Sequence, residues 1–165
     1  MSSKPAEQPD SVFLSLPDLR PFLDPARVLT ITGTPSKREI LVHVARTFIG
    51  HSAIGDHRGW LKAIYDREDV TSTGVGGGIA IPHAQHASVT DFTLAITRFP
   101  FGADFAAKDG QPVRILVMMA APPEQRPTYL KVLASIAARL NHPRICEAVL
   151  AAPEPQAVID AFVAN

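Results

Sequence analysis

The sequence predicts an α/β protein, α+β in strict usage, in which helices enclose a mixed β-sheet. Helical patterns stand both before and after the strand candidates, as expected when a sheet lies between two helical layers. Residues 113–120 form an almost unbroken apolar run, which is typical of a central strand covered on both faces. A chain of 165 residues is long enough for one domain with a hydrophobic core.

The chain begins with a segment that has little to bury. Residues 1–11 are rich in serine, proline and charge, so we expect a disordered tail ahead of a single domain at 12–165. Three prolines then suggest an irregular lead-in, and residues 27–31 are the first strand candidate.

Two helices are predicted next. Residues 36–39 (Ser-Lys-Arg-Glu) match a capping box, in which a serine hydroxyl and a glutamate satisfy free N–H groups at a helix start. Apolar residues follow at helical spacing, and Gly50 is placed to end this helix. A second helix is expected to start near Asp56 and to bury Trp60. It ends in the charged cluster 66–69, which we interpret as a solvated helix end.

The second half of the chain supplies the remaining strands and helices. Residues 92–99 alternate as a strand does, and two prolines close the apolar run that follows. Pro127 suits the first turn of a long helix, and shorter helices are expected at 143–150 and 155–164. The inner stripe of the long helix is predicted to consist of Leu130, Leu133, Ile136, Ala137 and Leu140.

Composition narrows the classes of partner. Acidic and basic residues balance at 16 each, so no strong field favours nucleic acid or membrane lipid. Cys146 is the sole cysteine, which excludes an internal disulfide, suits a reducing cytoplasm and is interpreted as a buried structural thiol. Neither a signal peptide nor an apolar run of membrane-spanning length is found. We expect a cytoplasmic protein without membrane insertion.

The segment 71–83 carries the most distinctive chemistry. Four of the five residues at 74–78 are glycine, which permits backbone that other residues avoid. A short apolar run then stops at Pro82, so His83 is expected where a strand gives way to a loop. Imidazole titrates near neutrality and can act as nucleophile, proton shuttle or ligand. The alternative is an ordinary turn in which His83 only caps a buried strand.

Several familiar sites are excluded. The glycine run lacks the lysine and hydroxyl of a P-loop, and an apolar strand follows where a dinucleotide fold requires a helix. His83 and His86 have no third candidate ligand for zinc. No nucleophile elbow of a serine hydrolase is present. We therefore expect neither a cofactor nor a metal.

The run from Ser72 to His83, Ser-Thr-Gly-Val-Gly-Gly-Gly-Ile-Ala-Ile-Pro-His, closely resembles a known active-site signature. It is that of the enzyme IIA proteins of the bacterial phosphoenolpyruvate-dependent phosphotransferase system, in the fructose/mannitol superfamily and most like its nitrogen-regulatory branch. The likeness extends from about Phe13 to the end, including Arg67-Glu68, residues 110–113 and residues 133–140. The resemblance implies a type-2 IIA domain over residues 12–165, folded as a three-layer α/β/α sandwich.

The resemblance also implies that His83 takes a phosphoryl group from the phosphocarrier HPr or its nitrogen-branch counterpart, as a tele-phosphohistidine. Transfer between two imidazoles requires positioning and neutralisation of charge on the oxygens. Arg67 offers forked donors for those oxygens. Further candidate donors are two hydroxyls and three backbone N–H groups, those of Ser72, Thr73, Gly76, Gly77 and Gly78.

Two positions depart from the family pattern. Tyr129 stands where many members have a second histidine facing the phosphoacceptor, and a phenol stays neutral at pH 7 where an imidazole can gain charge. This predicts either altered phosphoryl stability or a tolerated substitution at the edge of the site. Gly77 replaces the usual asparagine, which is expected to loosen the loop.

Three functions follow from these observations. The first is a regulatory phosphocarrier, favoured because no fused IIB or IIC segment is seen. The second is a separate IIA component that passes phosphate to a IIB protein of a fructose- or mannitol-type permease. The third is a binding module that keeps the fold but is not phosphorylated, which Tyr129 and Gly77 favour and which intact His83 and Arg67 oppose.

Overall fold

A computed structural model describes residues 16–164, and the predicted tail at 1–11 lies outside the described residues. Its centre is a six-stranded sheet in the order β1-β5-β6-β3-β2, with β4 also paired to β6. Strand β5 is antiparallel to β6, whereas β3 and β4 run parallel to it and β1 runs parallel to β5, so the predicted mixed sheet is confirmed. The strands are β1 (Val28–Thr30), β2 (Gly74–Gly76), β3 (Ile79–Ala80), β4 (His83–Gln85), β5 (Thr93–Ala103) and β6 (Val113–Ala121).

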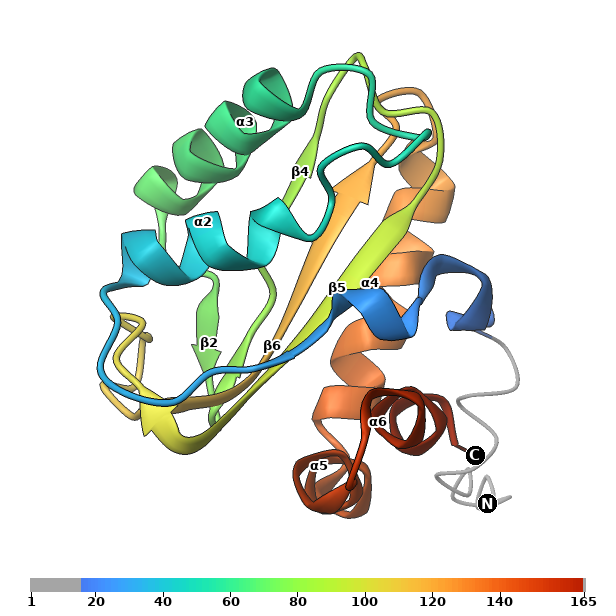
Figure 1. Ribbon diagram of the computed structural model, residues 1–165. Helices are drawn as coiled ribbons and strands as arrows, with labels where there is room; N and C mark the ends of the chain where they lie inside the picture. Colours follow the sequence, from blue (N-terminus) through green and yellow to red (C-terminus); the bar gives the residue numbers. More distant parts are fainter. Residues whose placement is uncertain (1–15, 165) are drawn as a thin grey trace, which may run out of the picture.

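Helices cover both faces of this sheet. Two lie on one face and three on the other, which produces the predicted three layers (Figure 1). The lead-in contributes two short 3-10 turns, η1 (Arg20–Phe22) and η2 (Pro25–Arg27). The helices of the first face are α2 (Lys37–Arg46) and α3 (His57–Val70), and those of the second are α4 (Arg126–Leu140), α5 (Pro143–Ala151) and α6 (Pro155–Val163).

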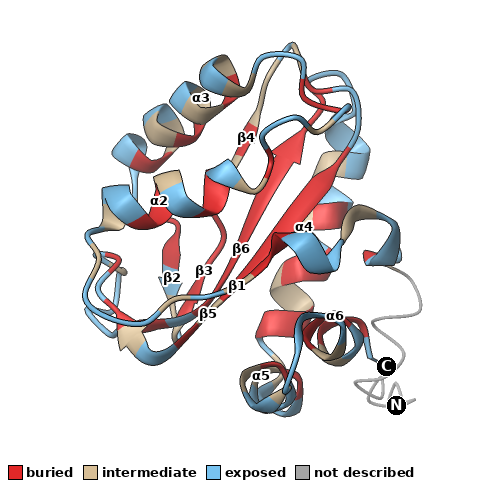
Figure 2. Ribbon diagram, viewed as in Figure 1, coloured by how far each residue is buried: buried red, intermediate tan, exposed pale blue. Residues whose placement is uncertain are grey.

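The two central strands divide the core into two halves. Both strands are buried along most of their length, while the helices are exposed on their outer sides (Figure 2). Side chains alternate between the faces, as the pleat of a strand requires. Leu94 and Ile96 of β5 pack toward α4, α5 and α6, and Ala95 and Phe99 pack toward α2 and α3.

Polar side chains begin the two helices of the first face as predicted. The Ser36 Oγ atom accepts the Glu39 N–H at 3.1 Å, which is the serine half of the expected capping box. The Glu39 carboxylate accepts the Ser36 hydroxyl rather than a backbone N–H, so the other half differs from the prediction. Asp56 caps α3 by accepting the Gly59 N–H at 2.9 Å.

The charged end of α3 differs from the prediction. The helix continues through the cluster 66–69 to Val70, and Glu68 is only 7% exposed. The solvated helix end is therefore wrong for this one residue. Glu68 faces the neighbouring segment of chain and is paired there, which makes the burial of a carboxylate tolerable.

The inner stripe of α4 is also displaced from the predicted one. Leu130 is 52% exposed, and the helix buries Val132, Ser135, Ile136, Arg139 and Leu140. Two residues correspond to about 200° around an α-helix, so a face centred on Val132 turns Leu130 to solvent. Leu133 and Ala137 are partly buried at the edge of this face.

Two arginines, the half-buried Arg98 and the buried Arg139, join the C-terminal helices to the rest of the fold. Arg98 of β5 donates to the carbonyls of Val149 and Ala152, at 3.1 and 2.7 Å. Arg139 of α4 donates to the carbonyls of Phe162 and Ala164, at 3.1 and 2.9 Å. Cations at these positions satisfy the carbonyls that a helix end leaves unpaired.

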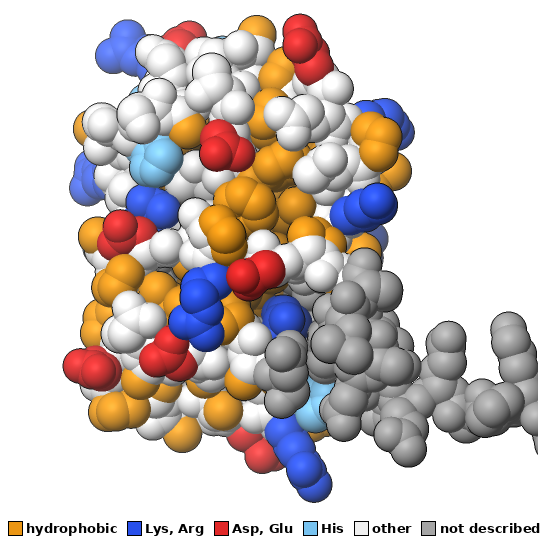
Figure 3. All heavy atoms as spheres, turned by 90° about the vertical axis from the view of Figure 1, so that its right-hand side faces the viewer, with side chains coloured by type: hydrophobic (Ala, Val, Ile, Leu, Met, Phe, Trp, Pro, Cys, Tyr) orange, Lys and Arg blue, Asp and Glu red, His pale blue; other side chains and the backbone are white. Residues whose placement is uncertain are grey.

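The surface agrees with the balanced composition. On the face shown in Figure 3, basic and acidic side chains are interspersed around a central group of hydrophobic ones. Among the described residues, no helix combines the length and apolar character that crossing a membrane requires. The Cys146 thiol is half-buried rather than fully buried and donates to the Leu140 carbonyl at 3.0 Å.

The α4 stripe yields a stability prediction. We expect Ile136→Ala to lower the free energy of unfolding by about 2–5 kcal/mol, because it empties a fully buried position. Leu130→Ala should change it by about 0.5 kcal/mol or less, because Leu130 is exposed. Urea denaturation of both variants measures the difference. Equal losses would contradict this orientation of the helix.

Candidate active site

His83 lies beside the carboxyl end of β6, the central strand. It opens β4 and is paired with Met119 near the end of β6. The preceding Pro82 carbonyl accepts the Met119 N–H at 2.9 Å, so the backbone before His83 is bonded into the sheet. The imidazole is half-buried. The backbone that carries the His83 side chain is therefore fixed in position, which suits chemistry that depends on positioning.

One hydrogen bond defines the protonation of the ring. The Nδ1 atom of His83 lies 2.6 Å from the Ile81 carbonyl oxygen. A carbonyl can only accept, so a neutral ring carries its proton on Nδ1 in this contact. The lone pair is then on Nε2, which is the nitrogen expected to act as nucleophile.

The surroundings keep the ring neutral. Burial is the main reason that the pKa of His83 lies below the ordinary histidine value, and the nearby Arg67 charge lowers it further. The Ile81 carbonyl and the Glu68 carboxylate favour the cation but do not offset the burial. His83 is thus an uncharged imidazole at pH 7, as a nucleophile requires.

Tyr129 approaches His83 from the first turns of α4. The centroids of the two rings lie 6.0 Å apart, with their planes inclined by 51°. The phenol is half-buried, and burial raises its pKa, so it stays protonated and can donate one hydrogen bond. Tyr129, expected from the resemblance to stand in place of a second histidine, is therefore next to the expected phosphoacceptor.

Arg67 reaches the same place from the last turn of α3. Its Nη1 atom donates to the Thr71 carbonyl at 3.0 Å, which fixes part of the guanidinium. Its charge lowers the pKa of both His83 and Tyr129, so it acts on both rings. The structure thus brings together His83, Arg67 and Tyr129 from three separate elements.

The two predicted hydroxyl donors are already engaged. Ser72 Oγ donates to the Phe105 carbonyl at 3.3 Å and accepts the Gly74 N–H at 3.1 Å. Thr73 is buried, and both its N–H and its hydroxyl donate to Glu68. These hydroxyls therefore hold the chain beside the site, and in this arrangement both donate to protein acceptors.

The predicted glycine donors lie away from His83. Gly76, Gly77 and Gly78 form the turn between β2 and β3, all with positive φ, and Gly77 N–H donates to Asp109 at 3.0 Å. The turn lies beside Ile115, whereas His83 lies beside Met119. Four residues of a strand span about 13 Å, so the structure does not place these N–H groups at the imidazole.

Glu68 is the residue of this region that the sequence reading missed as part of the site. It lies beside Arg67 within a run of four charged residues, a pattern typical of an exposed helix end. Its burial depends on Thr73, beyond the end of the helix, and on Lys37 of another helix, and helical periodicity reveals neither partner. The only signal was its place in the Arg67-Glu68 pair that carries the family resemblance.

Comparison with known proteins establishes the family. The model of the phosphoenolpyruvate-dependent sugar phosphotransferase system EIIA 2 domain matches residues 21–164. The chain belongs to this family. His83, in the place just described, lies within the matched residues.

Its relatives bear both sugar-related and regulatory names. The fructose-specific EIIA component of Haloferax volcanii is 30% identical over 84% of this chain and 90% of that protein. The nitrogen regulatory protein of Pseudomonas aeruginosa is 29% identical over 88% of this chain and 94% of that protein. The fructose-specific EIIABC component of Bacillus subtilis is 37% identical over 65% of this chain, which spans only 17% of that protein.

Solved structures share the fold. The nitrogen regulatory protein IIA-Ntr of Neisseria meningitidis has a TM-score of 0.78 at 24% identity, covering 86% of this chain and 97% of that one. The mannitol IIA of Escherichia coli has a TM-score of 0.70 at 18% identity, covering 85% and 98%. The predicted three-layer α/β/α fold is thus confirmed by independent structures.

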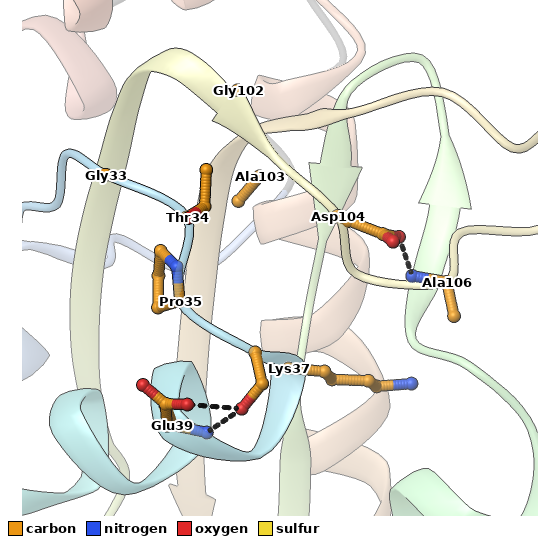
Figure 4. Close-up of a pocket in the computed structure, with 10 residues that line it drawn as sticks. Gly33, Thr34, Pro35, Lys37, Glu39, Gly102, Ala103, Asp104 and Ala106 are labelled. Atoms are coloured by element: carbon orange, nitrogen blue, oxygen red, sulfur yellow. Dashed lines mark hydrogen bonds between the residues drawn. The ribbon is translucent and has the colours of Figure 1, made fainter.

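A hollow of about 540 Å³ lies at the other end of the sheet from His83 (Figure 4). It lies between residues 33–37 and 102–106, where Ala103 pairs with Val113 of β6. Polar groups in its wall bond one another, as Asp104 does with the Ala106 N–H at 3.1 Å. Within residues 16–164, no cluster of three potential metal-binding side chains occurs.

The lowered pKa of His83 predicts its titration. We expect its midpoint, followed by NMR of the imidazole signals, below the ordinary value of about 6.5. As pH falls below about 6.5, the unfolded chain then binds this proton before the folded chain does. His83 therefore makes the fold less stable in that range and has no such effect above it. A midpoint above 6.5 would contradict the described surroundings of the ring.

Proposed function

We propose that this IIA domain is a phosphocarrier whose His83 accepts a phosphoryl group from HPr or its nitrogen-branch counterpart. The observation that carries the proposal is the Nδ1 contact with the Ile81 carbonyl, which leaves Nε2 as the basic nitrogen. Membership of the phosphotransferase family supplies the reaction class. No cofactor is needed, because phosphoryl transfer depends on positioning and on neutralisation of charge.

In the proposed step, the Nε2 lone pair attacks the phosphorus of a phosphohistidine on the donor protein. A new P–N bond forms on His83 while the P–N bond of the donor breaks, and the donor imidazole leaves with the electron pair. The proton on Nδ1 remains bonded to the Ile81 carbonyl throughout. Arg67 lies in the last turn of α3 beside the ring and would neutralise charge on the phosphoryl oxygens.

We further propose a regulatory role of the nitrogen-related kind, in which phosphorylation changes the proteins that are bound. The Pseudomonas relative supports it, since the similarity covers 88% of this chain. A IIA component of a sugar permease is the second candidate, supported by the Haloferax relative at 30% identity. Transfer from the phosphorylated domain to a fructose- or mannitol-type IIB protein distinguishes the two. Rapid transfer would favour the transport role.

A module that binds partners without being phosphorylated is the third candidate. Tyr129 favours it, because a neutral phenol stabilises the charge of a phosphoryl group less than a cationic imidazole would. The neutral His83 with Arg67 beside it opposes this alternative. Whether the domain gains a phosphoryl group, in the experiment described next, decides between this module and a phosphocarrier.

Intact-mass analysis tests the phosphoacceptor. After incubation with phosphoenolpyruvate, enzyme I and HPr or their nitrogen-branch counterparts, we expect one acid-labile phosphoryl group on the domain. His83→Ala should remove it, while His86→Ala, a matched change on the same segment, should retain it. Arg67→Ala should slow the transfer about a hundredfold because it removes a charged donor, and the exposed Arg58→Ala should not. Phosphorylation of folded His83→Ala would refute the assignment.

Tyr129 provides a second prediction. We expect Tyr129→His to accept the phosphoryl group about five- to tenfold faster at pH 6 to 7, because a charged donor bonds an oxyanion more strongly than a phenol does. Tyr129→Phe, which keeps the ring and loses the hydroxyl, should be slower than the natural protein. Time courses of phosphorylation measure both rates. Three equal rates would show that Tyr129 only packs at the edge of the site.

A further inference from the structure

Glu68 connects two helices to the chain that leads into β2. Its carboxylate accepts the Thr73 N–H at 3.0 Å and also the Thr73 hydroxyl. The Lys37 ammonium, from the first turn of α2, forms an ion pair with the same carboxylate. Glu68 is 7% exposed, so these three donors replace the water it would otherwise bind.

The backbone continues this connection to the imidazole. The Thr73 carbonyl accepts the Ile81 N–H at 3.1 Å, and the Ile81 carbonyl in turn contacts Nδ1 of His83. The path from Glu68 to the ring therefore consists of Thr73 and Ile81 alone. A shift of Thr73 would move the carbonyl that selects the tautomer of His83.

Residues 105–108 also hold the segment that contains Thr73. Gly74 accepts the Lys108 N–H at 2.9 Å through its carbonyl, and Ser72 bonds the Phe105 carbonyl. Lys37 contacts both Glu68 and these residues, because its Nζ atom lies 4.8 Å from the centroid of the Phe105 ring. Its side chain extends away from Pro35 and Glu39 (Figure 4) and ends in the ion pair with Glu68.

We propose that Glu68 is a positioning residue for His83, acting through Thr73 and Ile81 to hold the ring with its proton on Nδ1 and its lone pair on Nε2. This role rests on the proposed phosphoacceptor function of His83. Glu68 touches neither the ring nor a phosphoryl group in this arrangement. It acts by fixing the backbone whose carbonyl bonds the ring.

The chemistry of the contacts requires a carboxylate here. The Thr73 N–H, the Thr73 hydroxyl and the Lys37 ammonium are all donors toward Glu68, and an ionised carboxylate is a pure acceptor with two oxygens. A glutamine has the same shape but carries two N–H donors in place of one oxygen. The amide nitrogen of the glutamine would therefore face another donor, and a buried donor would be left without an acceptor.

The test compares Glu68→Gln with a matched variant of the same helix. Asp66→Asn also removes one carboxylate from α3, but Asp66 is exposed and paired only with Lys62 among the described ion pairs. Nitrogen-15 NMR of the imidazole reports the tautomer of His83, and the rate of transfer from phosphorylated HPr reports the reaction. Circular dichroism checks that each variant is folded.

We expect Glu68→Gln to give a mixture of the two His83 tautomers and a kcat about ten- to a hundredfold lower at unchanged KM, as when a supporting hydrogen bond behind a reacting group is lost. Asp66→Asn should match the natural protein in both. A folded Glu68→Gln with the natural tautomer and rate would overturn the proposal.

A pair of variants at Thr73 keeps the test decisive if Glu68→Gln does not fold. Thr73→Val replaces the hydroxyl by a methyl group, whereas Thr73→Ser keeps the hydroxyl and loses the methyl group. We expect the valine variant to show mixed His83 tautomers and the serine variant to keep the single tautomer of the natural protein. Identical tautomer mixtures in the two variants would count against the proposal. If the natural protein accepts no phosphoryl group, the proposed function fails, while the tautomer measurement still judges the role of Glu68.

Discussion

Strand β6 is the constraint on which the rest of the molecule depends. Strands β3, β4 and β5 all pair with it, and both of its faces are buried by helices. Because it must be apolar on both sides, it cannot itself carry polar chemistry, and the side chains of the candidate site come from elements at its carboxyl end. His83 enters from β4, Tyr129 from α4 and Arg67 from α3, so one strand sets the relation among three separate segments.

Buried and half-buried charges serve a common purpose in this fold. Arg98 and Arg139 bind the free carbonyls at the ends of α5 and α6, and Glu68 binds free donors beside α3. Each arginine compensates for lost water by donating to two backbone carbonyls, and Glu68 does so through one backbone N–H, one hydroxyl and one ammonium. Such pairing is the condition for burying charge. The charged residues of the interior therefore join elements that hydrophobic contact alone would leave free to slide.

The fold was predictable from sequence to the extent that its signals are local. The helix cap by the Ser36 hydroxyl, the proline in the first turn of α4 and the apolar run of β6 each depend on neighbours in the chain, and each of these was confirmed. The failures concern orientation and burial, which depend on distant partners. Leu130 fits a helical stripe by spacing, yet the direction in which the stripe faces is set by packing on the sheet.

The site shows the same division. The signature motif and the family resemblance singled out His83 and Arg67, and the structure places both beside Tyr129. Adjacency in sequence was misleading for the glycines, because β3 carries the chain about four residues along the sheet between the turn and His83. The hydroxyls of Ser72 and Thr73 could not be judged, since their partners Phe105 and Glu68 are assigned only by the folded chain.

The bonding of the backbone before His83 into the sheet bears on how a modified state could be read by another protein. With Pro82 and Ile81 both bonded, the segment has no loose hinge that a new group on the ring could swing. The chain has a formal net charge of zero at pH 7, and a phosphoryl group adds nearly two negative charges. A partner would therefore distinguish the two states by local electric potential at a rigid surface, and its discrimination would weaken as added salt screens that potential.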